Sequence, residues 1–380
     1  MAYKSFAVTV TGGSHTKHGK ECQDASFNNP KEDKGVSIAV VADGHGDDNC
    51  FRSAKGSELA VECASNGIQE FIKFHETKFS HGLLGKKDLP AQEEFDKAIR
   101  DLVKHIIALW QVKVEEDYTA HPFTAEELGK ADEKHRKKFN ADVGSRNKAY
   151  GSTLIAAAIT RDYWFGIHIG DGRFTALYAD GSFDQPVPWD DRCFLNIVTS
   201  ICDDDAYQRA RCYFTFHEAK PPPIAVFLCS DGIDDNYPVD ENEKHLFRLY
   251  RTIATTFAED GFDSTNKQLI DLANSFATKG KGDDTSIAGF IDMEGLKKTV
   301  PIWQKQIEDE EAVENVVKNE TQAEIKKEAE KPKKIDTRKV LEAKAFEAIE
   351  AYKKNMGAVK GDDLSYGGFH SVNIPESKNK

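Results

Sequence analysis

Aspartates stand at the ends of four apolar runs in this chain, and this recurrence constrains its fold more than any other sequence feature. The run Ile38 to Ala42 is typical of a buried strand, and Asp43 follows it directly. Three further aspartates flank apolar runs in the same way, namely Asp171, Asp231 and Asp283. Since a strand end is a rigid support, we expect these four carboxylates to converge on one oxygen-lined centre for a hard cation such as Mg²⁺ or Mn²⁺.

The turn Asp43-Gly-His-Gly46 adds two features to that expectation. Its glycines let the backbone turn sharply and approach an ion closely, and the carbonyl of Gly44 is a possible further oxygen ligand. His45 would then be held over whatever the carboxylate binds. Taken alone, however, the same residues fit a plain turn between two strands equally well.

The middle of the chain favours antiparallel sheets. Short apolar runs cover residues 154–159, 164–169 and 174–179 with short gaps, and Asp180-Gly181 is a hairpin signal. Parallel neighbours require a long crossover connection, so these runs predict a meander and exclude a doubly wound parallel sheet.

Six short motifs in a fixed order resemble the protein phosphatase 2C family of metal-dependent serine/threonine phosphatases, bacterial type, over about residues 1–293. They are Cys22-Gln-Asp24, Asp43-Gly-His-Gly46, Tyr150-Gly-Ser-Thr-Leu154, Gly170-Asp-Gly-Arg173, Ser230-Asp-Gly-Ile-Asp-Asp235 and Gly282-Asp-Asp-Thr-Ser286. The sequence departs from the family pattern with Gln23 for Glu, Gly172 for Ser and Asp284 for Asn. The resemblance implies an α+β fold, in which two antiparallel β-sheets pack as a sandwich flanked by helices.

The resemblance also implies an activity and its cofactors. The expected reaction is hydrolysis of phosphoserine and phosphothreonine in proteins by water, with two divalent cations, Mn or Mg, and a weaker third in some members. In this family pattern Asp43 bridges both ions, the Gly44 carbonyl binds one, and Asp231 and Asp283 bind the other. His45 is the expected general acid for the leaving alkoxide.

Two more carboxylates have expected supporting roles by the same resemblance. Asp24 orients a metal-associated water, and Asp171 either holds the third ion or caps the turn that follows it. The family's phosphate-binding arginine is absent, because Gly19 stands in its place. Lys20, His18 and His15 lie nearby and are candidate replacements, or else solvated loop residues.

Two other functions share these features. One is a catalytically weak, phosphatase-like binding or scaffold protein, although such relatives usually lose metal carboxylates that this chain keeps. The other is a hydrolase of small phosphorylated molecules. An opposing kinase is an expected partner of the protein phosphatase.

Net charge and cysteine usage indicate which partners and which cellular compartment to expect. The formal net charge is −13, which argues against a nucleic-acid partner because such proteins present basic surfaces. The 7 cysteines are dispersed without a CxxC pair, which is typical of reduced thiols in a cytoplasmic protein. The N-terminus is too polar for a signal peptide, and no apolar run is long enough to span a membrane.

The pattern also predicts where the chain is helical. We expect helices over about 51–75, 90–110, 241–258 and 265–278, and a capping box from Thr124 to Glu127. Residues 184–222 show no periodic pattern of apolar residues. We expect them to form either a flap near the site or a plain surface loop. The catalytic domain is expected to span 1–293, followed by a charged helical extension over 294–356 that could bind a partner, and a tail over 357–380 with little to bury.

Overall fold

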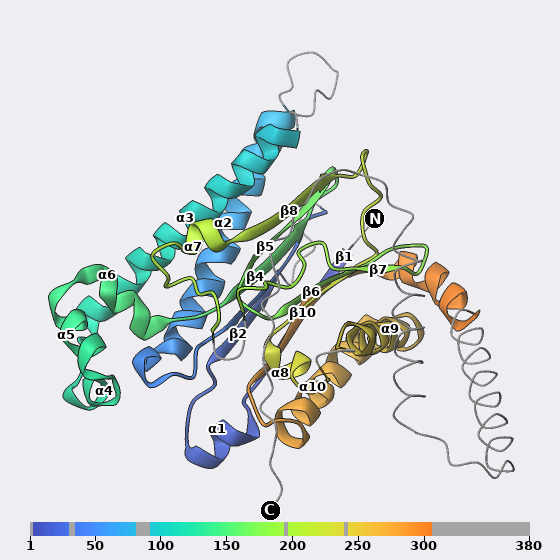
Figure 1. Ribbon diagram of the computed structural model, residues 1–380. Helices are drawn as coiled ribbons and strands as arrows, with labels where there is room; N and C mark the ends of the chain where they lie inside the picture. The colour runs from blue at the N-terminus through green and yellow to red at the C-terminus, as the bar shows by residue number, and fades with distance from the viewer. Residues whose placement is uncertain (1–2, 30–34, 81–91, 194–196, 239–241, 306–380) are drawn as a thin grey trace, which may run out of the picture. The chain divides into compact units, whose positions relative to one another are not determined.

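The computed structural model describes residues 3–29, 35–80, 92–193, 197–238 and 242–305, which form two five-stranded sheets (Figure 1). The first sheet has the order β1 (Tyr3–Val10), β10 (Thr285–Asp292), β9 (Ala225–Cys229), β6 (Arg173–Leu177) and β7 (Phe183–Asp184). The second has the order β2 (Asp24–Asn28), β3 (Ser37–Asp43), β4 (Leu154–Ile159), β5 (Tyr163–Ile169) and β8 (Arg211–Phe216). Every pairing within them is antiparallel, so the predicted α+β sandwich is confirmed.

Helices cover the outer face of each sheet. The long helices α2 (Ser53–Ser80) and α3 (Gln92–Ala120) pack on the second sheet, while α9 (Asn242–Asp260) and α10 (Phe262–Lys279) pack on the first. Shorter helices lie in the connections: α1 (Gly13–His18), α4 (Ala125–Lys130), α5 (Glu133–Ala141), α6 (Val143–Arg146), α7 (Ala206–Arg209), α8 (Asp231–Asp234) and the 3₁₀ turns η1 (Asp48–Cys50) and η2 (Asn147–Tyr150).

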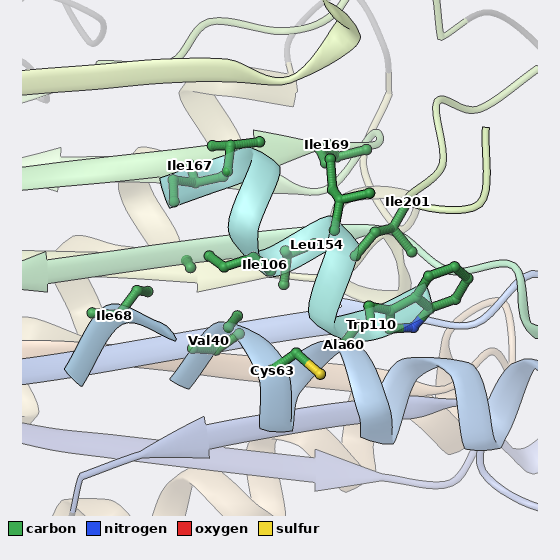
Figure 2. Packing of buried hydrophobic residues seen from close by; sticks show 14 of the residues in the cluster. Val40, Ala60, Cys63, Ile68, Ile106, Trp110, Leu154, Ile167, Ile169 and Ile201 are labelled. Carbon is green, nitrogen blue, oxygen red and sulfur yellow. The ribbon is translucent and has the colours of Figure 1, made fainter. Parts of the chain in front are cut away.

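Strand β3 shows how one sequence serves two cores. Successive side chains of a strand point to opposite faces. Ile38 and Val40 therefore join the core under α2 and α3, whereas Ala39 and Val41 join the core between the two sheets. Figure 2 shows the first of these cores, in which Val40 lies among side chains of α2, α3 and the neighbouring strands. Because both faces of β3 are buried, its end at Asp43 is firmly placed.

One strand connection differs from the predicted meander. β4 and β5 are neighbours as expected, but β6 belongs to the other sheet, between β9 and β7. The chain changes sheets at Gly170, whose φ of 114° lies in a region that residues with a side chain avoid. The predicted meander is wrong at this point, because a short connection does not require its two strands to pair within one sheet. The hairpin at Asp180-Gly181 is confirmed by the β6–β7 pair.

The segment 184–222 contains one strand that the sequence pattern did not reveal. β8 pairs with β5 along the edge of the second sheet and contributes Phe214 and Phe216 to the core under α3. The residues before β8 have no periodic pattern, so the short alternation of apolar residues within β8 is not evident in the sequence. The capping box of Thr124 and Glu127 is confirmed, and α10 begins at Phe262, three residues before the predicted start.

The packed region continues past the expected domain boundary at 293. Residues 293–305 are helical, and they bury Leu296, Val300 and Trp303 in the core with α9. The indole nitrogen of Trp303 donates to the carbonyl of Gly181 at 3.1 Å. The first compact unit runs from Met1 to Asp309. Most of the expected extension over 294–356 and the tail over 357–380 lie outside the described residues. Within the described part of the chain, no helix combines the length and apolar character needed to cross a bilayer.

Candidate metal and active site

The two sheets bring the predicted aspartates to one end of the sandwich. Asp24 begins β2 and lies directly opposite Asp43 at the end of β3. In the other sheet, β9 ends just before Asp231, and β10 begins just after Asp283. Asp171 lies two residues before β6, which pairs with β9 at this same end. Residues separated by more than two hundred positions in the sequence thus become neighbours.

Asp43 lies at the centre of this group. Its backbone N–H donates to Thr153 Oγ1 at 2.9 Å, and its carbonyl accepts from the Thr153 N–H at 2.8 Å. Burial first, and then the charges of Asp24, Asp231 and Asp171, raise the pKa of Asp43 well above its usual range. Its carboxyl also shares a hydrogen bond with that of Asp231.

The neighbouring carboxylates are perturbed in the same direction. Burial raises the pKa of Asp24 to about 7, partly offset by a hydrogen bond that Ser230 Oγ donates to Asp24 Oδ2 at 2.8 Å. Burial also raises the pKa of Asp171 to about 6. For Asp231, burial again acts first, with added repulsion from Asp171, Asp283 and Asp24. These groups resist ionisation together unless positive charge joins them.

The donor set fits divalent cations. None of Asp24, Asp43, Asp171 and Asp231 forms an ion pair with a described Lys, Arg or His, and Asp24 Oδ1 is buried without a hydrogen-bond partner. Within the described ranges, no three or more His, Cys, Asp or Glu side chains are drawn tightly enough together to hold an ion unaided. Since Mg²⁺ and Mn²⁺ favour oxygen ligands, and Mg²⁺ keeps several waters, an incomplete set of carboxylates suits them.

Gly44 occupies a position with no room for a side chain. A Cβ there would lie 2.6 Å from the Gln23 carbonyl oxygen and 2.7 Å from that of Ser53. The Gly44 N–H donates to the same Gln23 carbonyl at 3.0 Å. The Asp-Gly pair therefore permits β3 to pass closely between two other segments before the chain turns toward His45.

His45 is half-buried directly after this turn. Its backbone N–H donates to the carbonyl of Gly151 at 3.0 Å. Burial lowers the pKa of His45 to about 4, with a further lowering by Lys148 and a partial offset by Asp47. The imidazole is therefore neutral at neutral pH in this state.

The basic loop before Asp24 is anchored through Asp284. Asp284 is buried and accepts from the backbone N–H groups of Gly12 and Gln23, each at 2.6 Å. His15 Nδ1 lies 2.9 Å from Asp284 Oδ2, so this histidine is tied to a carboxylate. His18 is exposed with its Nδ1 on the carbonyl of Ser14, and Lys20 is exposed. Asp284 thus organises the loop, a role that its sequence did not reveal.

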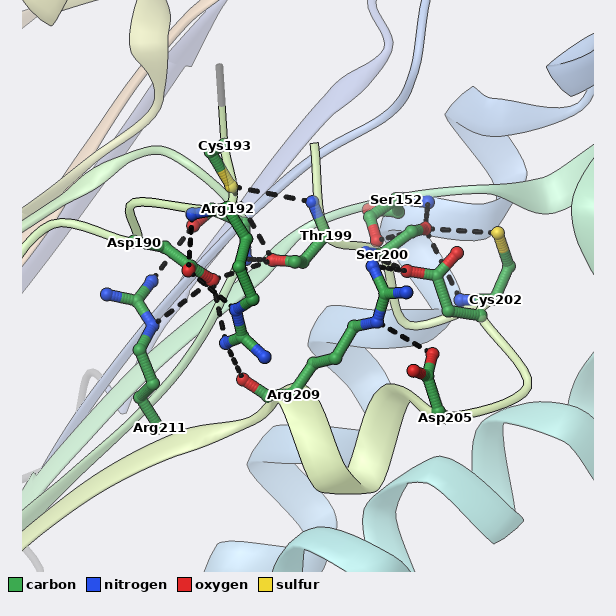
Figure 3. A network of polar contacts seen from close by, with 12 residues as sticks. Ser152, Asp190, Arg192, Cys193, Thr199, Ser200, Cys202, Asp205, Arg209 and Arg211 are labelled. Carbon is green, nitrogen blue, oxygen red and sulfur yellow. Dashed lines mark hydrogen bonds and ion pairs between the residues drawn. The ribbon is translucent and has the colours of Figure 1, made fainter. Parts of the chain in front are cut away.

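Residues in β8 and in the segment before it form hydrogen bonds to the turn Gly170-Asp171. Gly170 N–H donates to Thr199 Oγ1 at 2.8 Å, and Arg211 Nη2 donates to the Gly170 carbonyl at 3.0 Å. Figure 3 shows the surrounding network, in which Asp190 accepts from Arg192 at 2.8 Å and lies near Arg211. The described part of this segment is thereby joined to the turn that carries Asp171.

A sequence profile described as protein phosphatase 2C matches residues 11–272. The chain belongs to the protein phosphatase 2C family. As a member, it is a protein serine/threonine phosphatase, and therefore a phosphoric monoester hydrolase.

The solved structures that resemble this phosphatase 2C chain are distant in sequence. PppA, described as a key regulatory component of T6SS in Pseudomonas aeruginosa, is 14% identical, with coverage of 77% of this chain and 98% of that one and a TM-score of 0.44. The serine/threonine phosphatase Stp1 from Staphylococcus aureus is 15% identical, with coverage of 77% and 96% and a TM-score of 0.44. The catalytic domain of PstP, solved in complex with 2 manganese ions, is 14% identical, with coverage of 76% and 99% and a TM-score of 0.40. No curated protein sequence matches.

Proposed function

We propose that this phosphatase hydrolyses phosphoserine and phosphothreonine in proteins by direct attack of water, with two divalent cations, Mn or Mg, as cofactors. The observation that carries the proposal is the set of carboxylates around Asp43, which repel one another and have no basic side chain paired to them among the described residues. Two such cations, when bound, supply a nucleophilic water near neutral pH and offset charge on the phosphoryl oxygens.

The proposed ligand assignment is the one that the family resemblance implies, and the position of each carboxylate supports it. Asp43, the most central, would bridge both ions, and the Gly44 carbonyl beside it would bind one. Asp231 shares a hydrogen bond with Asp43 and is repelled by Asp283, which suits a second ion held by Asp231 and Asp283. Asp283 is exposed at its strand end, so it can reach an ion at the mouth of the site.

Asp24 and Asp171 would act around this pair. Asp24 is held by Ser230 on one oxygen and keeps the other free of protein partners, which suits a carboxylate that orients water. The charge of Asp171 repels those of Asp43 and Asp231, and Asp171 would hold a weaker third ion.

His45 would protonate the leaving oxygen of serine or threonine. It lies in the same turn as Asp43 and Gly44, and its backbone N–H donates to the Gly151 carbonyl at 3.0 Å. Because its pKa is low in this state, the role requires that the pKa rise when a phosphate dianion binds beside the ring. In the basic loop, Lys20 would attract the incoming phosphate, with His15 and His18 as supporting donors.

A phosphopeptide assay tests the reaction. We expect phosphate release from phosphoserine and phosphothreonine peptides with Mn²⁺ or Mg²⁺, complete loss with a chelator, and no phosphorylated enzyme intermediate. Hydrolysis of small phosphate esters alone would instead indicate a small-molecule substrate. A protein that binds phosphopeptide without hydrolysing it would be a scaffold.

The phosphatase unit should extend to about residue 309, and the chain beyond it would recognise a partner or protein substrate, with an opposing kinase acting on the same targets. A chain cut after Asp309 is expected to keep metal-dependent hydrolysis of an aryl phosphate. A chain cut after Met293 should be destabilised, because it loses the buried Trp303 and Leu296. Equal stability of both shortened chains would return the boundary to 293.

A further inference from the structure

Three backbone hydrogen bonds fix the segment from Lys148 to Gly151: one from Arg52, one within the segment and one from the active-site turn. Arg52 N–H donates to the Ala149 carbonyl at 2.8 Å, and Gly151 N–H donates to the Lys148 carbonyl at 3.1 Å. The third bond runs from the His45 N–H to the Gly151 carbonyl at 3.0 Å. This segment therefore cannot move independently of the turn that carries His45.

The space beside Gly151 is small, and the side chains of His45, Cys50 and Cys202 surround it. A Cβ on Gly151 would lie 2.8 Å from His45 Cδ2, 3.0 Å from Cys50 Sγ and 3.3 Å from Cys202 Sγ. Lys148 interacts electrostatically with these same three side chains, and its amine hydrogen-bonds the Cys50 thiol. Figure 3 shows Cys202 beside Ser200, whose hydroxyl lies 3.1 Å from the Cys202 sulfur. The ammonium group of Lys148 thus lies in one small volume with the imidazole.

The charge of Lys148 is not neutralised there. The side chain is half-buried and, among the described residues, forms no ion pair. Burial lowers its pKa, but Cys50, Cys202 and the more distant Asp47 and Asp203 together raise the pKa above its usual value. The amine is therefore protonated at neutral pH, and an unpaired cation in a half-buried position costs free energy unless an anion joins it.

We propose that Lys148 binds the phosphate group of the substrate beside His45. This inference rests on the proposed function and adds a substrate-binding residue to it. At the carboxylate end, the two proposed cations would attract one side of a phosphate dianion. On the His45 side it meets an ammonium with hydrogen-bond donors to spare, and a charge-assisted hydrogen bond to phosphate is among the stronger polar contacts.

The test replaces the charge and keeps the bulk. In Lys148→Met, the dissociation constant of inorganic phosphate for the Mn²⁺-loaded protein, measured by calorimetry, should rise about tenfold, the ratio that corresponds to 1.4 kcal/mol. KM for an aryl phosphate should rise in parallel, while the affinity for Mn²⁺ should not change. Lys148→Arg should restore phosphate affinity to within about threefold, since it returns the positive charge. Lys148→Gln gives the same measurement if the methionine variant folds poorly.

The matched control is Lys130→Met, which removes an exposed lysine from α4 in the same helical insertion. It should leave phosphate affinity unchanged. A Lys148→Met protein with a lower melting temperature and an unaltered phosphate affinity would overturn the inference and make the lysine structural.

The same measurements separate this inference from the reaction. If the wild-type protein hydrolyses phosphopeptide and Lys148→Met binds phosphate normally, only the inference fails. If phosphate binding depends on Lys148 but no hydrolysis occurs with Mn²⁺ or Mg²⁺, the reaction fails and the binding residue stands. A wild-type protein that neither binds phosphate nor hydrolyses its esters contradicts both.

Discussion

The acidic and the basic groups of this site come from two different kinds of structure. The carboxylates of Asp24, Asp43 and Asp231 lie at or beside the ends of strands whose flanking residues are buried. The cations come from connections: Lys20 follows the short helix α1, and Lys148 belongs to the turn η2 in the insertion between α3 and β4. The sandwich thus fixes the proposed metal ligands directly, whereas the proposed substrate contacts depend on how each connection is attached to it.

The two basic connections are tied in different ways. The loop with Lys20 is joined to the sheet through the buried carboxylate of Asp284, which also takes up His15. The segment with Lys148 is joined through backbone bonds to His45 and Arg52, and its ammonium remains without an ion-pair partner among the described side chains. The first arrangement uses a histidine for anchoring, while the second leaves a charge available to a ligand.

The largest effect should follow removal of a central carboxylate. Asp43→Asn or Asp231→Asn is expected to lower kcat about 10³-fold or more, because the loss of several kcal/mol of metal-ion stabilisation has that size. Mn²⁺ titration with activity and calorimetry as readouts measures it. Wild-type turnover in either variant would show that the replaced aspartate is not a metal ligand. It would also contradict the idea that the strand ends supply the metal ligands.

Replacement of His45 should slow the hydrolysis of some substrates more than that of others. His45→Ala is expected to reduce kcat about 10²-fold for a phosphoserine peptide, the lower end of the range for lost general-acid catalysis. An aryl phosphate with an acidic phenol as leaving group should lose much less, since it departs without a proton. Equal losses on the two substrates would assign His45 a positioning role.

The sequence marked the strand-end aspartates, which the two sheets bring together, but it did not mark Lys148, the substrate contact that we propose. Asp43, Asp171, Asp231 and Asp283 were identifiable because a strand end joins an apolar run to a carboxylate in a pattern that survives in one dimension. Lys148 precedes a recognised motif by two residues, yet nothing in its own sequence marks it. Its placement depends on Arg52 and Gly151, contacts that exist only after α2 and β4 pack. The exchange of sheets at Gly170 was missed for a similar reason, because a positive φ is not readable from the residue alone.

Arg52 should determine how firmly the Lys148 segment is held. Its guanidinium donates to Glu127 at 2.7 Å, to Tyr150 at 2.8 Å and to Asp117 at 3.3 Å, with little exposure. Arg52→Ala leaves these partners uncompensated and is expected to lower the free energy of unfolding by about 3 kcal/mol. Urea unfolding measures this loss, and Arg52→Lys should recover only part of it, because lysine cannot form the bidentate pair.

Phosphate affinity of the folded Arg52→Ala protein sharpens the comparison. If the segment positions Lys148, the dissociation constant of phosphate should rise while Mn²⁺ affinity stays constant. A rise in both would mean that the insertion supports the carboxylate end as well, and that the two halves are not independent.

The smallest expected effect lies in the basic loop. Lys20 is exposed, and an exposed charge is screened by solvent and salt, so Lys20→Ala should raise KM for a phosphopeptide only a few-fold, on the order of threefold.

The paired change of His15 and His18 to alanine should act differently: it removes the contact of His15 with Asp284, and therefore should lower stability as well as raise KM. Steady-state kinetics at low and high salt separate these cases, since long-range attraction by Lys20 weakens as salt rises, whereas a loosened loop does not recover. Lys17→Ala, which removes another exposed lysine from α1, is the matched control and should behave as wild type. An unchanged KM in Lys20→Ala at every salt concentration would leave Lys148 as the cation that receives the phosphate, and would show that closeness to Asp24 in the sequence was the wrong guide to the binding site.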